Sequence, residues 1–290
     1  PNEVKNAIKE AVKLGYRHID CAFIYKNERE IGEAISEALK ENNLKREDLF
    51  ITSKLWNTEH IPERVSVACE QTIHNLKLDY LDCYLMHWPV SFKPGGEPYP
   101  KNADGSYALD STPLWETWEA MQELKKEGLV RTVGVCNFTI PLLEELIDDS
   151  DIVPTVNQVE FHPYLNQQDL LQFCKSKGIQ IQAYSPLGTG PVPHSQEVVL
   201  LDDLKVKSVA AKHNKTPAQV LLRWGIQHQM VILPKSVNPQ RLQQNLSLFD
   251  FSLDADDMNR LNALHKNLRY VNPEWGPFKV DETAELGLLA

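Results

Sequence analysis

The stretch RHIDCAFIY, residues 17–25, combines the pattern of a buried strand with a charged side chain. Apolar and β-branched residues from Ile19 to Ile24 predict a strand in the core, and Asp20 interrupts them. An unpaired buried carboxylate is costly, so Asp20 requires a cationic partner. Because Tyr25 follows five residues later, we expect a carboxylate and a phenol at the mouth of a β/α barrel.

Helix-like and strand-like segments alternate along the chain on both sides of this stretch. The expected strands are residues 17–21, 49–55, 80–86, 132–136, 155–160, 179–184 and 230–233. The expected helices are residues 2–14, 27–42, 62–76, 114–127, 140–147, 167–177, 202–213, 217–227, 239–246 and 254–264. Asn2 is the expected cap of the first helix and Gly15 its stop, and Thr216 is expected to cap the helix that opens with Pro217.

This alternation predicts the α/β class, a (β/α)8 TIM barrel with seven barrel strands visible, in a single domain spanning residues 1–290. A closed barrel needs an eighth strand, which we expect upstream in a segment of about 20 to 25 residues. Without that strand, residues 17–21 and 230–233 become two sheet edges with a gap between them.

Amino-acid composition and net charge limit the classes of molecule that this protein can bind. The chain has 290 residues, of which 42% are hydrophobic and 24% charged, and its formal net charge is −10. That charge argues against nucleic acid as a partner, and the absence of a membrane-length apolar run argues against a membrane. The N-terminus shows no signal peptide, and the five scattered cysteines favour reduced thiols. We therefore expect a cytoplasmic protein, and a monomer.

Ionisable side chains recur where the predicted strands end. Lys54 closes the strand in LFITSKL and His87 follows YLDCYLM, so both join Asp20 and Tyr25 at the ends of three successive strands. A single strand-end histidine is more often a hydrogen-bonded core residue, and a single lysine is usually solvated. Four such groups at equivalent positions favour an active site, because barrel active sites form at this face.

The motifs IDCAFIY, ITSKLW, LDCYLMHWP, GVCNF, VNQVEFHPYL, QAYSPLG and ILPKS occur here in this order. In order and spacing they resemble the signature stretches of the aldo-keto reductases, most closely the aldose/aldehyde reductase branch. The resemblance runs from residue 1 to about residue 250. It implies NADPH-dependent reduction of aldehydes, both aldoses and other small carbonyl compounds, and a catalytic tetrad of Asp20, Tyr25, Lys54 and His87.

The tetrad has a physical logic of its own. Reduction of a carbonyl needs a proton for the alkoxide, and a phenol with a pKa near 10 is a poor acid at neutral pH. Lys54 would lower the pKa of Tyr25, with Asp20 keeping the lysine charged, and this effect has to outweigh burial. A neutral His87 would hydrogen-bond the carbonyl oxygen and orient the substrate.

The resemblance also assigns the NADPH site, and the absence of a G-x-G-x-x-G stretch after a strand agrees with a cofactor held outside a Rossmann fold. It implies that Cys136, Asn137 and Gln158 contact the nicotinamide carboxamide and that Tyr184 stacks under the ring, with Ser185 and Leu187 close by. Cys136 departs from the more usual serine. The implied 2′-phosphate pocket and adenine contacts are Lys235, Ser236, Val237, Asn238, Arg241, Gln244 and Asn245.

Substrate contacts follow from the same resemblance. The aromatic and apolar positions that match the pocket wall are Ile24, Trp56, Trp88, Phe92 and Tyr99, although aromatics at such spacing also fit a core. The C-terminal tail, residues 265–290, is expected near this pocket and looks like that of fungal xylose- and glycerol-type reductases. The resemblance therefore favours small aldehydes and sugars as substrates.

Two other functions stay open on the sequence. Some family relatives act as lens proteins or ion-channel accessory subunits, so a non-enzymatic structural or accessory role is one alternative. A metal hydrolase that uses Asp20, His87 and His162 is another, but the sequence lacks a paired histidine ligand motif and we expect no metal.

Overall fold

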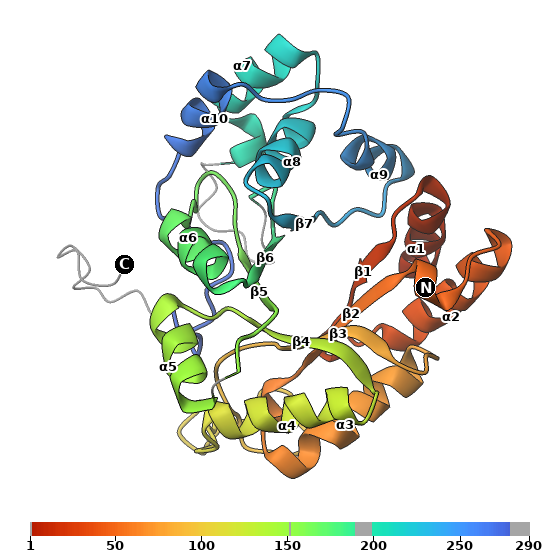
Figure 1. Cartoon of the computed structure of the whole chain (residues 1–290), viewed down its shortest axis with the longest axis vertical. Coiled ribbons are helices and arrows are strands. Elements are labelled where there is room, and N and C mark those ends of the chain that lie inside the picture. Colours follow the sequence, from red (N-terminus) through yellow and green to blue (C-terminus); the bar gives the residue numbers. More distant parts are fainter. Residues whose placement is uncertain (1, 151, 189–198, 279–290) are drawn as a thin grey trace.

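Seven parallel strands form one sheet in the order β1-β2-β3-β4-β5-β6-β7, and helices surround it (Figure 1). This computed structural model describes residues 2–150, 152–188 and 199–278. The strands are β1 (His18–Asp20), β2 (Phe50–Leu55), β3 (Leu81–Met86), β4 (Val130–Cys136), β5 (Val156–Glu160), β6 (Gln180–Tyr184) and β7 (Val231–Leu233). The α-helices are α1 (Glu3–Leu14), α2 (Glu28–Glu41), α3 (Pro62–Asn75), α4 (Leu114–Lys126), α5 (Ile140–Ser150), α6 (Gln168–Lys177), α7 (Leu204–His213), α8 (Pro217–Gln227), α9 (Pro239–Leu246) and α10 (Ala255–Asn262).

Each strand and helix predicted from periodicity is present, and the ends differ by at most three residues. The capping of α8 is confirmed, since the Thr216 hydroxyl accepts from the Gln219 N–H in a capping box. Gly15 ends α1 with a φ of 113°. The prediction for Asn2 is wrong, because its φ of 70° is left-handed and its side chain makes no cap hydrogen bond.

Short 3₁₀ turns were not predicted. They are η1 (Phe23–Tyr25), η2 (Arg46–Asp48), η3 (Asn57–Glu59) and η4 (Leu200–Asp202). The first and third follow β1 and β2 directly, so they shape the face where the strands end. A three-residue turn carries too little periodicity for a sequence pattern to reveal it.

The two outer strands of the sheet are β1 and β7, as expected from a count of seven. β1 pairs with β2 and β7 pairs with β6, and no pairing joins β1 to β7 within the described residues. Figure 1 shows the ring of strands nearly closed, with these two strands facing each other across the remaining opening. The predicted gap between them is therefore confirmed.

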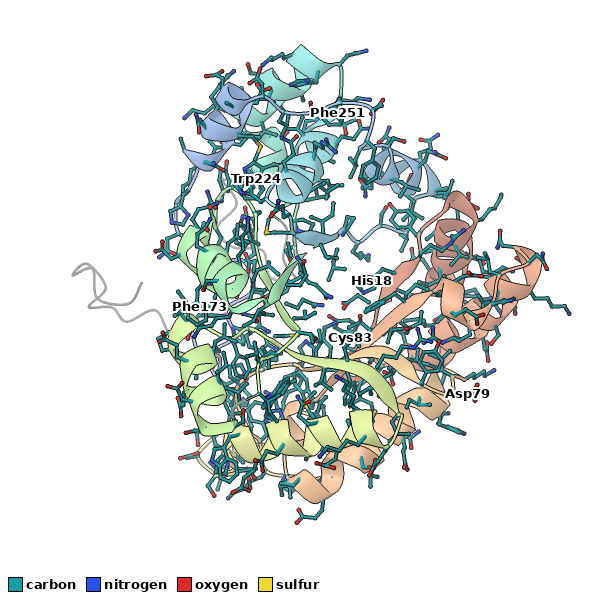
Figure 2. All side chains as sticks on the ribbon, viewed as in Figure 1. His18, Asp79, Cys83, Phe173, Trp224 and Phe251 are labelled. Carbon is teal, nitrogen blue, oxygen red and sulfur yellow. The ribbon has the colours of Figure 1, made fainter. Side chains whose placement is uncertain are left out.

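The central strands of the sheet are buried on both faces. All six residues of β3 are buried, which matches the continuous apolar run expected of a central parallel strand. In Figure 2, Cys83 lies among the strands, whereas Trp224 and Phe173 lie in the helical layer. The five cysteines are buried and unpaired. No helix within the described residues combines the length and apolar character needed to cross a membrane.

A buried carboxylate at the end of β5 holds the C-terminal segment against the barrel. Glu160 is fully buried and accepts hydrogen bonds from the backbone N–H groups of Tyr270 and Val271, both at 2.8 Å. His162 Nε2 lies 2.8 Å from the same carboxylate, and its Nδ1 accepts from the Leu165 N–H. Since Nδ1 is an acceptor, Nε2 carries the proton and donates to Glu160.

Replacing Glu160 with glutamine should destabilise the protein most at neutral pH. Burial raises the pKa of Glu160, but the hydrogen bonds from His162 and from the two backbone donors lower it by more, so the net pKa is below its ordinary value. Such a group stabilises the fold above its unfolded pKa, and this stabilisation is lost as pH falls through the folded pKa. We expect Glu160→Gln to cost about 1 to 3 kcal/mol at pH 7 in urea unfolding.

The loss of stability caused by Glu160→Gln should become smaller as the pH falls below the pKa of an ordinary glutamate. Glu144→Gln, a change at an exposed position of α5, is the matched control and should leave the unfolding midpoint unchanged. A Glu160→Gln cost that stays constant from pH 7 down to acid pH would show that the charge of Glu160 is not what stabilises the segment.

Candidate active site

An ion pair between Lys54 and Asp20 forms the centre of the strand-end face. Lys54 closes β2 and is 1% exposed, and its Nζ donates to Asp20 Oδ2 at 2.6 Å and to the Cys21 carbonyl at 2.8 Å. Burial lowers the pKa of Lys54, but the Asp20 carboxylate and Tyr25 raise it more, so the pKa is above its ordinary value. Lys54 is therefore an ammonium at neutral pH, and Asp20 has the cationic partner that its place in the strand requires.

Tyr25 stands beside this pair at the mouth of the barrel. It ends η1, it is 51% exposed, and the centre of its ring lies 5.4 Å from Lys54 Nζ. The Lys54 charge lowers the pKa of Tyr25, but desolvation and the Asp20 charge raise it, and the net pKa lies above the ordinary value. The charge of Lys54 has the largest single effect on the pKa of Tyr25, larger than that of burial as expected, but burial and the Asp20 charge together outweigh it. The phenol is protonated at neutral pH.

His87 follows β3 and faces the same region. Its ring centre lies 6.1 Å from that of Tyr25 and 5.3 Å from that of Trp56, both in edge contacts. Burial, the Lys54 charge and His60 all lower the pKa of His87, to well below its ordinary value. The imidazole is therefore neutral at pH 7, and the structure brings all four tetrad side chains together.

The residues assigned to the nicotinamide lie next to the tetrad and already bond to it. Gln158 Nε2 donates to Asp20 Oδ1 at 2.8 Å. Asn137 Nδ2 donates to the His87 carbonyl at 2.9 Å, and the Tyr184 hydroxyl donates to Asn137 Oδ1 at 2.8 Å. These contacts, which sequence reasoning did not predict, link the ends of β4, β5 and β6 to the tetrad.

Two other predicted cofactor residues follow β6, and one ends β4. Ser185 has a φ of 48° in the turn after β6, and Leu187 is two residues further along. Cys136 is buried at the end of β4, where burial raises the pKa of its thiol well above the ordinary value. The Cys136 sulfur is therefore an uncharged thiol that can offer only a weak hydrogen bond.

The predicted phosphate pocket lies between β7 and the start of α9. Lys235 and Arg241 are exposed, and neither forms an ion pair with any residue that the structure describes. Asn238 caps α9 by accepting from the Arg241 N–H at 3.1 Å. The remaining members, Ser236, Val237, Gln244 and Asn245, occupy the same loop and helix, with Asn245 buried. Two unpaired cations at a helix N-terminus fit a phosphate dianion.

An aromatic cluster forms one wall beside His87. Trp56, Trp88 and Phe92 are buried together, and Trp275 from the C-terminal segment packs edge-on against all three at 6.1, 5.0 and 5.2 Å between ring centres. Tyr99 lies 5.2 Å from Trp56 and is 44% exposed. Other side chains that pack against the cluster are Ile24, Tyr107, Val271 and Phe278.

Sequence reasoning placed the C-terminal tail near this wall without singling out Trp275. Its signal was a tryptophan in a Pro- and Gly-rich segment, a residue type that such a segment buries only against another surface. Tyr107, 5.9 Å from Phe92 and stacked on it, lies in the long loop after β3 and was also missed. Of the predicted tail, residues 279–290 lie outside the described residues.

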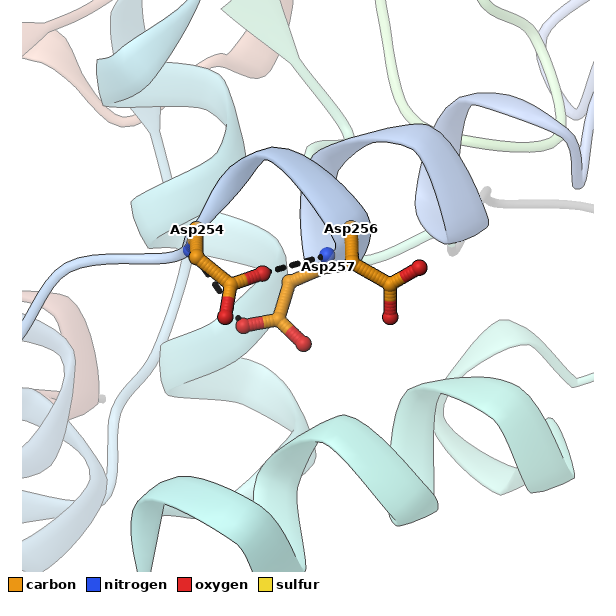
Figure 3. Close-up of side chains that lie close together, drawn as sticks. All are labelled: Asp254, Asp256 and Asp257. Atoms are coloured by element: carbon orange, nitrogen blue, oxygen red, sulfur yellow. Dashed lines mark hydrogen bonds between the residues drawn. The ribbon is translucent and has the colours of Figure 1, made fainter.

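Among the described residues, Asp254, Asp256 and Asp257 are the one acidic or histidine group close enough to share a metal ion (Figure 3). Asp254 and Asp257 instead form the capping box of α10, and Lys212 Nζ donates to both. The set Asp20, His87 and His162 does not converge, since His162 bonds to Glu160. The geometry therefore gives no support to a metal hydrolase.

Comparison with known proteins agrees with this geometry. Residues 1–266 match the model of the aldo/keto reductase family. Mouse and human aldo-keto reductase family 1 member A1 are 48% and 47% identical to the chain over 276 residues, covering 94% of this chain and 85% of theirs.

Among solved structures, the aldose reductase from Schistosoma japonicum superposes with a TM-score of 0.91 at 42% identity, covering 97% of this chain and 92% of that one. The comparisons agree with the converging Asp-Tyr-Lys-His set on a barrel of parallel strands. This protein therefore belongs to the aldo/keto reductase family of oxidoreductases.

Proposed function

We propose that the protein reduces aldehydes, including aldoses and other small carbonyl compounds, to alcohols with NADPH. The observation that carries the proposal is the position of Tyr25, whose ring contacts Lys54 of the Lys54–Asp20 pair and also contacts the neutral His87. A general acid, a cation that stabilises its conjugate base and a neutral hydrogen-bond donor are the groups that carbonyl reduction needs.

Each tetrad residue has one role in this proposal. NADPH, when bound, supplies the hydride. His87 donates a hydrogen bond to the carbonyl oxygen and orients it, and Tyr25 gives its phenolic proton to the oxygen as negative charge develops there. Lys54 then stabilises the phenolate, because its ammonium lies on the Tyr25 ring face, and Asp20 holds the ammonium in place.

The cofactor contacts extend from β4 to α9. Cys136, Asn137 and Gln158 would hold the carboxamide end and Tyr184 would stack on the ring, with Ser185 and Leu187 along the way. Lys235 and Arg241 would bind the 2′-phosphate. This part of the proposal is supported by two exposed cations that lack an ion pair in the described chain and by the hydrogen-bonded row of Gln158, Asn137 and Tyr184.

The aromatic wall favours a small substrate with an apolar or hydroxylated body. The side chains of this wall, Trp56, Trp88, Phe92 and Trp275, carry no charge that could bind an ionic group of a substrate. The proposal includes a cytoplasmic monomer that has a small carbonyl compound as its partner. A purely structural or accessory role is not favoured, because such a role gives no reason to bury Lys54 beside Tyr25.

Replacing Tyr25 with phenylalanine should abolish reduction and leave the cofactor bound. The phenol supplies the proton and holds no part of NADPH, so we expect kcat to fall by at least about 10²-fold, the lower range for loss of a general acid. NADPH affinity, measured by quenching of protein fluorescence, should be unchanged. Tyr80→Phe, a change of a phenol that bonds to Arg131 away from the tetrad, is the control and should keep full activity. Substantial turnover by Tyr25→Phe would reject Tyr25 as the proton donor.

Replacing Arg241 with alanine should weaken NADPH and spare NADH. A charge-assisted contact contributes about 1.5 to 3 kcal/mol, which corresponds to a loss of roughly 10- to 100-fold in NADPH affinity. NADH lacks the 2′-phosphate, so its dissociation constant should stay the same. Arg260→Ala, on α10, is the control for removing an arginine charge. Equal losses for both cofactors would show that Arg241 does not read the phosphate.

A further inference from the structure

The chain segments that follow β2 and β3 lie side by side behind the tetrad. Their contacts are the His87 N–H to the Leu55 carbonyl at 3.1 Å, the Phe92 N–H to the Asn57 carbonyl at 2.9 Å, and His60 Nδ1 to Ser91 Oγ at 3.0 Å. The two segments thus run together from the ends of their strands for about five residues each.

Buried polar atoms without a partner concentrate in these two segments. Across the described residues, eight buried side-chain nitrogens and oxygens lack a hydrogen-bond partner, and four belong to Asn57, His60 and His87. They are both amide atoms of Asn57, Nε2 of His60 and Nδ1 of His87. Buried polar groups are almost always hydrogen-bonded, so a concentration of this kind indicates a shared partner.

The proton on His60 can be assigned from its neighbours. Ser91 Oγ donates its hydrogen to the Thr112 carbonyl at 3.3 Å. A serine has a single hydroxyl hydrogen, so Ser91 accepts the bond from His60, and His60 Nδ1 carries the proton. Burial lowers the pKa of His60 to about 3, so the ring is neutral and its buried Nε2 is a lone pair. His60 Nε2 therefore needs a donor.

The proposed function places the proton of His87 on Nε2, whereas that of His60 lies on Nδ1. Of its two ring nitrogens, Nδ1 is the buried one that lacks a partner, which leaves Nε2 for the substrate. A neutral His87 that donates to a carbonyl oxygen from Nε2 has a lone pair on Nδ1. Two lone pairs cannot bond each other, whereas one water molecule has two hydrogens to give.

We propose that Asn57, His60 and His87 hold one buried water molecule that donates a hydrogen to each imidazole and accepts one from the Asn57 amide. Three hydrogen bonds are the usual number for a buried water. The water fixes His87 with its proton on Nε2, so Asn57 and His60 are positioning residues for the carbonyl donor. The resulting chain of hydrogen bonds runs from the Thr112 carbonyl through Ser91, His60, the water and His87 to the substrate. This inference rests on the proposed role of His87, but its protonation pattern can be tested without turnover.

Nitrogen-15 NMR of the histidine-labelled protein with NADPH bound measures the pattern directly. We expect His60 to carry its proton on Nδ1 and His87 to carry its proton on Nε2 between pH 6 and 8, spanning the ordinary histidine pKa of about 6.5. Substitution of each histidine in turn assigns its signals. A proton on His60 Nε2, or on His87 Nδ1, would overturn the proposal even if the enzyme reduces aldehydes.

Substitution of His60 tests the positioning role. In His60→Phe we expect His87 to populate the Nδ1–H form and kcat/KM to fall about 10- to 100-fold, as when the group that orients a functional histidine is removed. NADPH affinity should be unchanged. His60→Gln keeps an oxygen that can accept from the water and an N–H that can donate to Ser91, so it should retain more activity than His60→Phe. His228→Phe, a change of a histidine that bonds to Asn262 on the far side of α8, is the control and should not change kcat/KM.

Ser91→Ala keeps the proposal testable if His60→Phe fails to fold. Without Ser91 the His60 proton is free to move to Nε2, so the NMR signals of His60 should change while those of His228 stay fixed. A folded His60 variant with unchanged His87 protonation and unchanged kcat/KM would overturn the proposal. Loss of all aldehyde reduction in the wild type, with the NMR pattern intact, would count against the proposed function and leave the water-held pair standing.

Discussion

The site depends on keeping the Lys54 ammonium charged inside the barrel. Removing an ion from water costs several kcal/mol, so the fold has to surround Lys54 with acceptors. It does so with Asp20 and the Cys21 carbonyl, and Gln158 from β5 holds the other oxygen of Asp20. The ion pair thus ties together β1, β2 and β5. Because Asp20 offsets the field of Lys54, the pKa of Tyr25 lies above its ordinary value and the phenol keeps its proton at neutral pH. In the proposed mechanism, this is the proton that would pass to the carbonyl oxygen.

A second buried carboxylate, Glu160, acts on the C-terminal segment in a different way. Its three donors come from His162 and from the backbone of the C-terminal segment. The carboxylate therefore fixes where residues 270 and 271 cross the barrel, and Trp275 reaches the aromatic wall from there. The tetrad and the aromatic wall are therefore held in place by different interactions. The tetrad relies on a salt bridge between strands, and the wall relies on a carboxylate that accepts hydrogen bonds from backbone N–H groups. Changes in the C-terminal segment can alter the wall without disturbing Lys54.

The sequence was informative where one residue had one partner. Asp20 in an apolar strand required a cationic partner, and periodicity located the strands and α-helices of the described chain, because burial imposes a spacing on side chains. The sequence was less informative where several neighbours act on the same side chain. Gln158 and Asn137 form hydrogen bonds with Asp20 and with the His87 carbonyl. The pKa of Tyr25 is raised because several neighbours act on its phenol. Such balances depend on distances between strands, which no linear pattern contains. Trp275 was missed for the same reason.

Charge distribution separates long-range from local effects in cofactor recognition. A net charge of −10 repels a polyanion at a distance. At physiological ionic strength, however, charges farther apart than about 8 Å are largely screened, so only nearby groups count. Lys235 and Arg241 form no ion pair in the described chain, whereas Arg46 and Lys212 are held by carboxylates. An acidic protein can therefore recognise a phosphate dianion, provided that unpaired cations lie together at the point of contact.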